Sequence, residues 1–326
     1  MSENEKDREK AGGLTTTMEG VDVVSKEEIE AILKKVDKEA SARKLVGASR
    51  WIVYLIGVSW SIFQVYTAAF GLFPAQFQRS IHLGYAFVMT FLLFPASSRD
   101  SSNRLTWFNW VLVAFAGYIG LYMALNYIRI MEAGGDYSRM DFIAAGFGIL
   151  LTLEAARRVV GLPIVCLAAF FIVYTYFGAY FPGFMAHRGY SLERIASHMY
   201  LTTEGILGIP LGVAATFIYL FILFGSFREK SGLGQLFIDI SNAVAGWASG
   251  GPAKMAIVTS ALEGTVSGSS VANTVESGSL TIPMMKRLGY RPEFAAAVEA
   301  SSSTGGQIMP PIMGAAAFIM AEFLNV

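Results

Sequence analysis

The sequence predicts an all-α integral membrane protein, a polytopic helical bundle with a re-entrant helical hairpin and a discontinuous transmembrane helix. Of its 326 residues, 54% are hydrophobic and only 15% are charged, whereas a typical soluble domain has about 25% charged residues. Several apolar runs approach 20 residues, the length that crosses a bilayer as a helix. Two interruptions rich in Gly and Ser then divide the apolar pattern of the C-terminal part of the chain.

This composition excludes water-soluble enzymes, disordered regulators and nucleic-acid-binding proteins. Basic and acidic residues number 25 each, so the formal net charge is +0. A neutral chain has no basic field to attract a nucleic acid. The lipid bilayer is therefore the expected surrounding, and no nucleic acid is expected as a partner.

Residues 1–45 form a polar segment, which we expect to be a cytoplasmic tail. Within it, Ser25 and Glu28 have the spacing of a capping box. Apolar residues then recur at helical spacing over 29–36. The tail is predicted to contain a short amphipathic helix that rests on the membrane or on the protein itself, and a regulatory docking site is the alternative.

Six apolar runs follow the tail, and each is predicted to cross the membrane, because only a helix satisfies its own peptide groups in hydrocarbon. Trp107 and Trp110 stand at the start of the third run, where an aromatic belt would lie. The six runs are residues 51–73, 81–96, 107–128, 141–156, 162–181 and 209–227.

The distribution of basic residues predicts the orientation of these spans. If the tail is cytoplasmic and the spans alternate, about twenty Lys and Arg residues lie on the cytoplasmic side and five on the other. Cytoplasmic loops of membrane proteins carry such an excess. Residues 183–206 would then form an outer connection, either a solvated connector or a docking surface for an extracytoplasmic partner.

The first interruption predicts a re-entrant hairpin over about residues 252–285. A Gly250-Gly251-Pro252 break precedes 253–262, an apolar stretch too short to span. A polar segment rich in Gly and Ser follows at 263–274, and residues 279–285 are again short and apolar. Backbone without helical structure survives at membrane depth only where protein buries it or where it lines a wet cavity.

The second interruption predicts a discontinuous helix over about residues 293–324. A helix beginning near Phe294 should stop at the Ser and Gly run 301–306 and resume at Ile312. Paired glycines give the backbone freedom, and Pro310 and Pro311 cannot donate the hydrogen bonds of a continuous helix.

Together the two breaks predict a solute site near the bilayer midplane. Carbonyl groups at half-helix C-termini and Ser, Thr or Asn oxygens suit a hard monovalent cation, and half-helix N-termini suit a carboxylate. The alternative is that small residues merely let helices pack closely. We expect the hairpin tip, with Ser267, Gly268, Ser270 and Asn273, to face the helix break, with Ser303, Thr304, Gly305 and Gly306.

Three glutamates are secondary candidates for ion coupling, because an ionisable group at membrane depth is often functional. These are Glu263, Glu276 and Glu299. We expect them near the cytoplasmic ends of the helices or in polar stretches, where water reaches them.

Several of these motifs resemble the large membrane subunit of tripartite ATP-independent periplasmic (TRAP) transporters. The similarity is specific over about residues 140–326 and only general before them. It is strongest to fused permeases that work with TAXI-type binding proteins. The motifs are Gly264–Ala272 (GTVSGSSVA) with Asn273-Thr274, residues 281–290 (TIPMMKRLGY), residues 300–312 (ASSSTGGQIMPPI) and Ala315–Glu322 (AAAFIMAE).

The resemblance implies secondary transport of an organic anion, typically a carboxylate, driven by a sodium gradient and by an elevator-like movement. It implies a TAXI-type periplasmic binding protein as partner and a location in the cytoplasmic (inner) membrane of a bacterium or archaeon. It implies no cofactor other than sodium as the coupling ion. By similarity, sodium would contact Ser267, Gly268, Ser270, Asn273 and Gly305, and substrate would contact Ser269, Thr274, Ser303, Thr304, Gly306, Pro310 and Pro311.

The resemblance also suggests a division of the chain. Residues 46–160 would match a four-helix small subunit, and residues 161–326 the first half of the large subunit. The family's transport domain has two inverted repeats, whereas this chain carries one set of hairpin and broken helix. A truncated sequence is the expected reason, and completion by another polypeptide is the alternative.

Two other functions are compatible with the sequence. One is an intramembrane hydrolase with Ser269 or Ser270 as nucleophile, which needs a base within hydrogen-bond reach. The histidines His82, His187 and His198 are expected on the outer side, so Lys254 or Lys286 would have to serve. The other is a channel or a non-transporting assembly subunit of the membrane.

Overall fold

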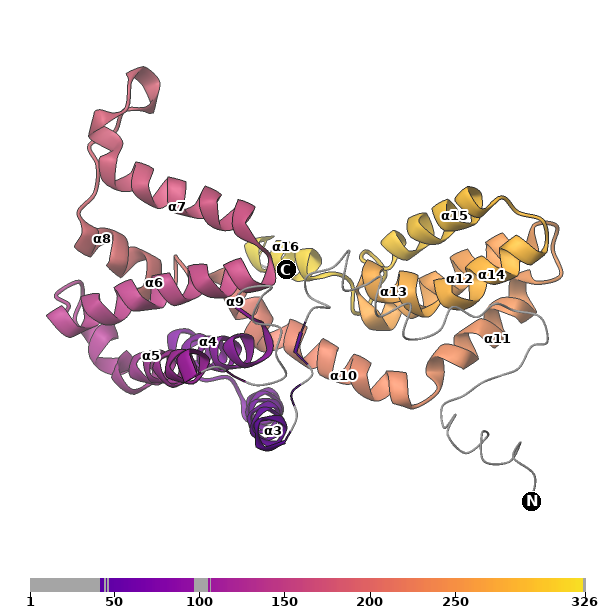
Figure 1. The fold of residues 1–326 in the computed structure, drawn as a ribbon, viewed down its shortest axis with the longest axis horizontal. Coiled ribbons are helices and arrows are strands. Elements are labelled where there is room, and N and C mark those ends of the chain that lie inside the picture. Colours follow the sequence, from indigo (N-terminus) through magenta and orange to yellow (C-terminus); the bar gives the residue numbers. More distant parts are fainter. Residues whose placement is uncertain (1–41, 44, 46, 97–104, 106, 325–326) are drawn as a thin grey trace.

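Helices form the regular structure of this chain, as predicted. The computed structural model describes residues 42–324 except 44, 46, 97–104 and 106, and this part contains no strand (Figure 1). The predicted helix within residues 25–36 lies outside the described residues. The helices are α3 (Ala48–Phe70), α4 (Ala75–Leu93), α5 (Trp107–Glu132), α6 (Arg139–Val159), α7 (Leu162–Phe177), α8 (Leu192–Ala196), α9 (Ile209–Val213), α10 (Tyr219–Lys230), α11 (Leu233–Ala245), α12 (Gly251–Ser267), α13 (Ser270–Glu276), α14 (Gly278–Arg287), α15 (Pro292–Gly305) and α16 (Ala315–Leu324).

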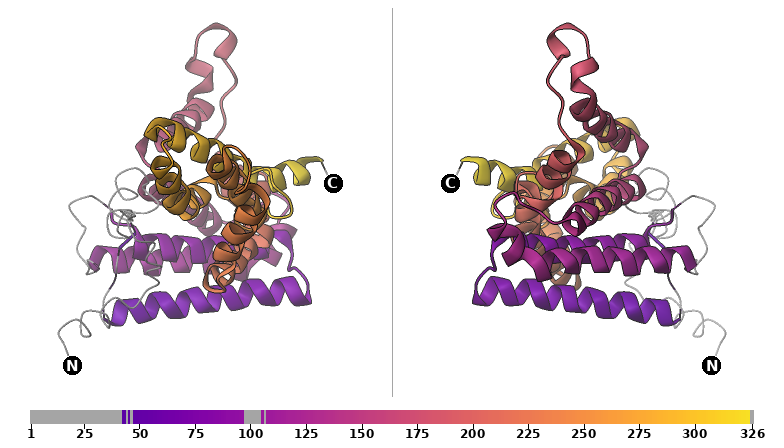
Figure 2. Two further views of the ribbon diagram at one scale, coloured as in Figure 1. Left: turned by 90° about the vertical axis from the view of Figure 1, so that its right-hand side faces the viewer. Right: turned by 90° about the vertical axis from the view of Figure 1, so that its left-hand side faces the viewer.

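The helices gather into two lobes. Helices α3–α6 and α9 lie in one lobe, and α12–α15 form the other, which we call the hairpin lobe (Figure 1). Helix α10 runs between the two lobes and α11 packs against α12, whereas α16 lies near the middle of the molecule, where it packs against α9. Figure 2 shows α3 lying alongside α4 and α5. The candidate solute site of the sequence analysis therefore falls in the hairpin lobe.

The first lobe is built on the pair α4 and α5. Gly84 and Gly120 let the two backbones meet, because a Cβ atom on Gly120 would lie 2.5 Å from the Gly84 Cα. Phe87, Phe91 and Met123 are almost completely buried beside this crossing. Small residues at a helix crossing are a common way to pack membrane helices closely.

Four helical segments are long and apolar enough to cross a membrane by length and composition, among the described residues. They are Ala48–Phe70, Trp107–Glu132, Leu162–Tyr180 and Ile209–Arg228. Two of the six expected spans, now α4 and α6, have the required length but are too polar or too charged to count among these four. Helix α4 is more polar because its first turns contain Gln76, Gln78 and His82, whose side chains are buried within the protein.

Residues 192–201, within the predicted outer connection, pack against the first lobe. Helix α8 continues into a π-helical turn, Ser197–Leu201, and Ile195, Tyr200 and Leu201 are buried. The Tyr200 ring contacts α6 at Gly148, where a Cβ atom would lie 2.4 Å from the ring. This segment is therefore packed against the protein.

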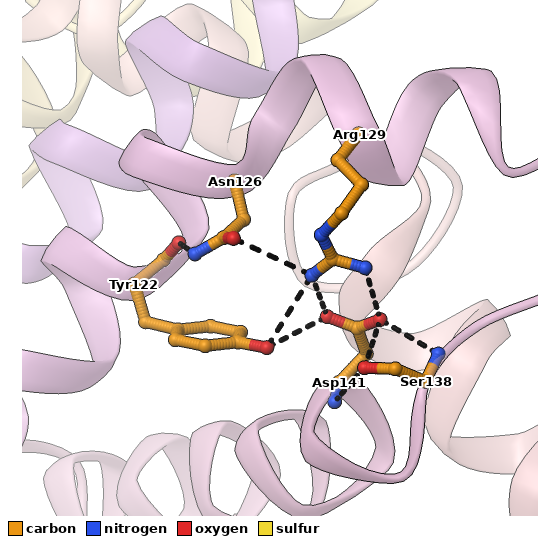
Figure 3. Close-up of polar contacts among 5 residues, drawn as sticks. All are labelled: Tyr122, Asn126, Arg129, Ser138 and Asp141. Atoms are coloured by element: carbon orange, nitrogen blue, oxygen red, sulfur yellow. Dashed lines mark hydrogen bonds and ion pairs between the residues drawn. The ribbon is translucent and has the colours of Figure 1, made fainter.

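A dense polar cluster joins α5 to the start of α6 (Figure 3). The Asp141 carboxylate is completely buried and accepts both guanidinium nitrogens of Arg129, at 2.5 and 2.8 Å. It also accepts the Tyr122 hydroxyl at 2.8 Å and the Ser138 amide at 2.8 Å. Ser138 and Asp141 together form a capping box for α6. One side chain thus holds the helix start, the connection and α5 together.

We expect Asp141→Ala to lower the free energy of unfolding by about 2 kcal/mol, since it leaves the Tyr122 hydroxyl and the α6 N-terminus without their shared acceptor, whereas the half-exposed Arg129 side chain can turn to solvent. Denaturant titration of the purified protein in mixed micelles measures this change. Asp136→Ala is the matched control, because Asp136 is exposed in the same connection. Equal stability of the two variants would contradict the role given to Asp141.

The breaks in the hairpin lobe are shorter than the sequence suggested. Helix α12 continues to Ser267 and α13 starts at Ser270, so only two residues separate them, whereas the polar pattern of 263–274 predicts a longer break. Helix α15 continues to Gly305, and α16 starts at Ala315 instead of Ile312.

Local hydrogen bonds explain why these polar stretches stay helical. The Thr265, Thr274, Ser302 and Thr304 hydroxyls each donate to a carbonyl three or four residues earlier, at 2.6–2.8 Å. Such bonds satisfy a Ser or Thr side chain within its own helix. Stretches rich in Ser and Thr can therefore remain helical in this lobe.

Candidate functional site

The candidate site begins at the tip of the hairpin, between α12 and α13. Gly268 ends α12 in the left-handed conformation, with φ of +62°, which favours glycine. Ser269 then caps α13, since its hydroxyl accepts the Ala272 amide at 3.2 Å. The chain thus reverses within two residues.

The tip lies against the segment that separates α15 from α16. A Cβ atom on Gly268 would lie 2.0 Å from the Met313 carbonyl oxygen, so only glycine allows this approach. The Ile312 amide donates to the Thr265 carbonyl at 3.4 Å, and the Gln307 side chain donates to the Ser270 hydroxyl at 3.0 Å. The two interruptions predicted from the sequence therefore meet in space.

Behind the tip, α12 and the end of α15 touch through two glycines. A Cβ atom on Gly264 would lie 2.4 Å from the Gly306 Cα. Asn273 is completely buried beside Gly306. Its side-chain oxygen is hydrogen bonded to the Ser267 hydroxyl, and its amide donates to the Ser260 carbonyl at 3.4 Å. The C-terminal ends of two helices and an amide oxygen converge here, and helix C-termini carry partial negative charge.

Five of the predicted site residues come together at this place. They are Ser267, Gly268, Ser270, Asn273 and Gly306. Ser269 lies at the tip as the helix cap, and Gly305 ends α15 with nothing within 4 Å of its Cβ position.

The other predicted residues face elsewhere. Thr274 and Thr304 bond to carbonyls of their own helices. Pro310 and Pro311 are exposed and joined by a cis peptide bond. Ser303 is buried, but its hydroxyl donates to Glu299 at 3.0 Å and is not directed to the tip.

Glu299 is the centre of a second polar cluster inside the hairpin lobe. Its carboxylate is completely buried and receives four hydroxyl groups from three segments. Ser277 donates at 2.6 Å, Ser303 at 3.0 Å and Ser260 at 3.2 Å, and Thr281 also donates. The cluster ties α12 and α14 to α15.

Glu263 is also completely buried, on α12, whereas Glu276 is half-buried and paired with Arg228 of α10 at 3.1 Å. The expectation that water reaches all three glutamates is therefore wrong for Glu263 and Glu299. The cause is the length of α12 and α15, which continue past these positions and pack against each other.

Sequence reasoning missed the contacts made by Gln307, Gly264 and Met313. Gln307 directly follows the paired glycines, which was a usable signal for a side chain at the break. Gly264 and Met313 carry no such signal, because one is a helical glycine and the other contributes only its carbonyl.

Comparison with known proteins gives a family model that matches residues 147–326. Its description is "Tripartite ATP-independent periplasmic transporter, DctM component". The chain is 33% identical over 128 residues to the C4-dicarboxylate TRAP transporter large permease protein DctM of Vibrio cholerae, covering 38% of this chain and 26% of that protein. It is 35% identical over 106 residues to the isethionate TRAP transporter permease protein DctMQ of Oleidesulfovibrio alaskensis, covering 32% and 15%.

A third relative is the 2,3-diketo-L-gulonate TRAP transporter large permease protein YiaN of Escherichia coli, 28% identical over 106 residues, covering 32% of this chain and 25% of that protein. The chain thus spans about a quarter or less of the length of these relatives. No solved structure matches the chain.

Proposed function

This chain belongs to the DctM family of TRAP transporter large permease components, and from that premise we propose that it carries part of a sodium-coupled pathway for small organic acids. Its relatives are named as TRAP transporter permease proteins for C4-dicarboxylate, isethionate and 2,3-diketo-L-gulonate. All three are small anions. The chain is a multi-pass membrane protein and not an enzyme.

The observation that carries the sodium proposal is the convergence of two helix C-termini at the hairpin tip. Helices α12 and α15 end beside each other. The carbonyls of the last turn of α15 accept amides of the segment that follows it, and each carbonyl oxygen has a second lone pair for a cation. Hydroxyl and amide oxygens of Ser267, Ser270 and Asn273 lie at the same place. Carbonyl and neutral side-chain oxygens with partial negative charge favour a hard monovalent cation such as sodium.

The remaining parts of the proposal rest on the family. A periplasmic binding protein, of TAXI type, would deliver the anion to the outer face. The chain would lie in the inner membrane with its N-terminal tail in the cytoplasm. The hairpin lobe would move against the first lobe in an elevator-like step. Figure 1 shows the hairpin lobe separated from the first lobe and joined to it through α10, which supports a movement of one lobe against the other.

A serine hydrolase receives no support from the geometry. The Ser269 hydroxyl caps α13 and the Ser270 hydroxyl accepts from Gln307. Lys254 lies near the opposite end of α12 from the tip, and the three histidines belong to other segments. Among the described contacts of the two serines, none is with a base.

We expect Asn273→Ala and Ser270→Ala to weaken sodium binding at least about tenfold, because each removes a side-chain oxygen from the tip. Equilibrium binding of ²²Na⁺ to the purified protein measures this, and sodium-dependent uptake of a C4-dicarboxylate by the complete transporter in proteoliposomes extends it. Ser226→Ala is the control, since the Ser226 hydroxyl is exposed and bonds within α10. Unchanged sodium affinity in both tip variants would refute the proposed site.

A further inference from the structure

A short turn at the outer end of α7 carries side chains that the proposed solute site does not use. It comprises residues 178–190, between α7 and α8, and it projects beyond the neighbouring helices of the first lobe (Figures 1 and 2). The segment Leu162–Tyr180 is long enough to cross the hydrocarbon core, which is about 30 Å thick. Under the predicted orientation, residues 181–190 therefore lie beyond the core on the outer face of the membrane.

The turn is held in one shape by hydrogen bonds to α7 and within itself. The Tyr174 hydroxyl donates to the Met185 carbonyl at 2.6 Å, and the Gly189 amide donates to Nδ1 of His187 at 3.1 Å. The His187 amide donates to the Gly178 carbonyl at 3.0 Å. The His187 ring packs so closely on Gly178 that a Cβ atom there would lie 2.0 Å away. A surface fixed in this way loses little conformational freedom when it binds a partner.

The turn exposes two aromatic side chains beside a hollow. Phe184, midway along the turn, is 99% exposed, and Tyr180 is 85% exposed. The hollow has a volume of about 350 Å³ and lies between the last turn of α7 and residues 188–191. Aromatic side chains on a rigid surface are typical anchors of protein interfaces.

Unpaired positive charge borders the same hollow. Arg188 lines it, and the Arg188 and Arg194 guanidinium carbons lie 5.5 and 5.6 Å from the centre of the Tyr190 ring. Residues 178–190 contain no Asp or Glu. In the part of the chain that the structure describes, neither guanidinium forms an ion pair with a carboxylate. Arginine binds a carboxylate through two parallel hydrogen bonds, so the hollow can receive an acidic side chain.

We propose that the turn 178–190 is a docking surface for the periplasmic binding protein, which places an acidic side chain beside Arg188 and covers Phe184 with an apolar surface. The identity of the partner rests on the proposed function, whereas the surface is argued from the turn alone. Of the predicted outer connection, residues 192–201 are packed against the protein, which leaves this turn free to dock. Lipid headgroups are a less suitable occupant, since a headgroup layer needs neither a fixed turn nor a hollow.

The experiment measures binding of the substrate-loaded binding protein of the same transporter to the purified chain in phosphatidylcholine nanodiscs, by biolayer interferometry. Arg188→Glu and Phe184→Ala should each weaken the affinity at least about tenfold, because charge reversal repels an acidic partner and truncation removes the aromatic anchor. Arg139→Glu, the same charge reversal at an exposed side chain that begins α6, is the control and should bind as wild type does. Wild-type affinity in both turn variants would overturn the docking surface.

Sodium binding separates this proposal from the proposed function. Equilibrium binding of ²²Na⁺ should be unchanged in Arg188→Glu and Phe184→Ala, since the turn is remote in sequence from the hairpin tip. A wild type that binds sodium but not the binding protein would overturn the docking surface and leave the sodium site standing. A wild type that binds the binding protein through the turn but binds no sodium would refute the sodium site alone.

A fluorescent probe on the turn distinguishes the binding protein from the membrane. Cys166 is the single cysteine of the chain, so Phe184→Cys in a Cys166→Ser background gives one site for a bimane label. Adding the binding protein should shift the bimane emission to shorter wavelength, and brominated phosphatidylcholine should not quench it. Quenching by the brominated lipid, with no shift on adding the binding protein, would place the turn in the membrane and overturn the docking surface.

Discussion

Gly306→Ala is expected to abolish sodium-dependent uptake, whereas Gly305→Ala, one residue earlier, is expected to leave most of it. A methyl group on Gly306 would lie 2.3 Å from the Asn273 amide nitrogen and 3.0 Å from the Gly264 Cα. Asn273 is completely buried and Gly264 contributes backbone, so neither can move without opening the hairpin. A methyl group on Gly305 meets nothing within 4 Å.

Sodium-dependent uptake of small organic acids by the transporter in proteoliposomes checks this pair, with the amount of folded protein measured by size-exclusion chromatography. The expected difference is at least about a hundredfold in initial rate, since displacing a ligand by an ångström has such effects. Gly305→Ala keeps the backbone carbonyl at that position, so it preserves any ligand that the main chain provides. Equal rates in the two variants would show that the contact between the glycines is not needed for transport.

Gly264→Ala tests the same contact from the other helix. Its methyl group would lie 2.4 Å from the Gly306 Cα. The loss should match that of Gly306→Ala, and the double variant should be no worse than either single one, because all three disrupt a single contact.

The sequence was sufficient for the fold class because the signals were local. Apolar runs of bilayer length and Gly-rich breaks are properties of short segments, and α3, α5, α7 and the two interruptions are found close to their expected places. The positions where helices end were harder to predict. Ser and Thr hydroxyls such as those of Thr265 and Ser302 bond back to their own helices, so polar sequence did not mark loop structure.

The contents of the site depended on tertiary packing that no local pattern encodes. Ser267, Gly268 and Gly306 were expected at the meeting point because glycine and small polar residues interrupt helices. Ser303 had the same signal, yet it lies on the face of α15 that carries Glu299 one turn earlier, and it donates to that carboxylate. The burial of Glu299 follows from the packing of α12 and α14 on α15, which depends on residues far apart in sequence.

Glu299→Ala should lower the free energy of unfolding by about 3 kcal/mol, because it leaves the buried Ser260 and Ser303 hydroxyls without their acceptor. The Ser277 and Thr281 hydroxyls each keep a main-chain carbonyl as acceptor. Ser260, Ser277 and Ser303 are completely buried, so water cannot replace the carboxylate without opening the lobe. Glu293→Ala, in the first turn of the same helix, is the matched control and should change stability by less than about 0.5 kcal/mol.

Denaturant titration in mixed micelles measures both variants, and limited proteolysis shows where the loss is located. Cleavage should appear first between α14 and α15, around Gly289, whereas the first lobe should stay resistant, since its core shares no residue with the Glu299 cluster. If Glu299→Ala unfolded at the same denaturant concentration as Glu293→Ala, the hydroxyls would have other partners available. The Glu299 carboxylate would then not be the group that holds the hairpin helices α12 and α14 against α15, and other contacts between these helices would have to do so.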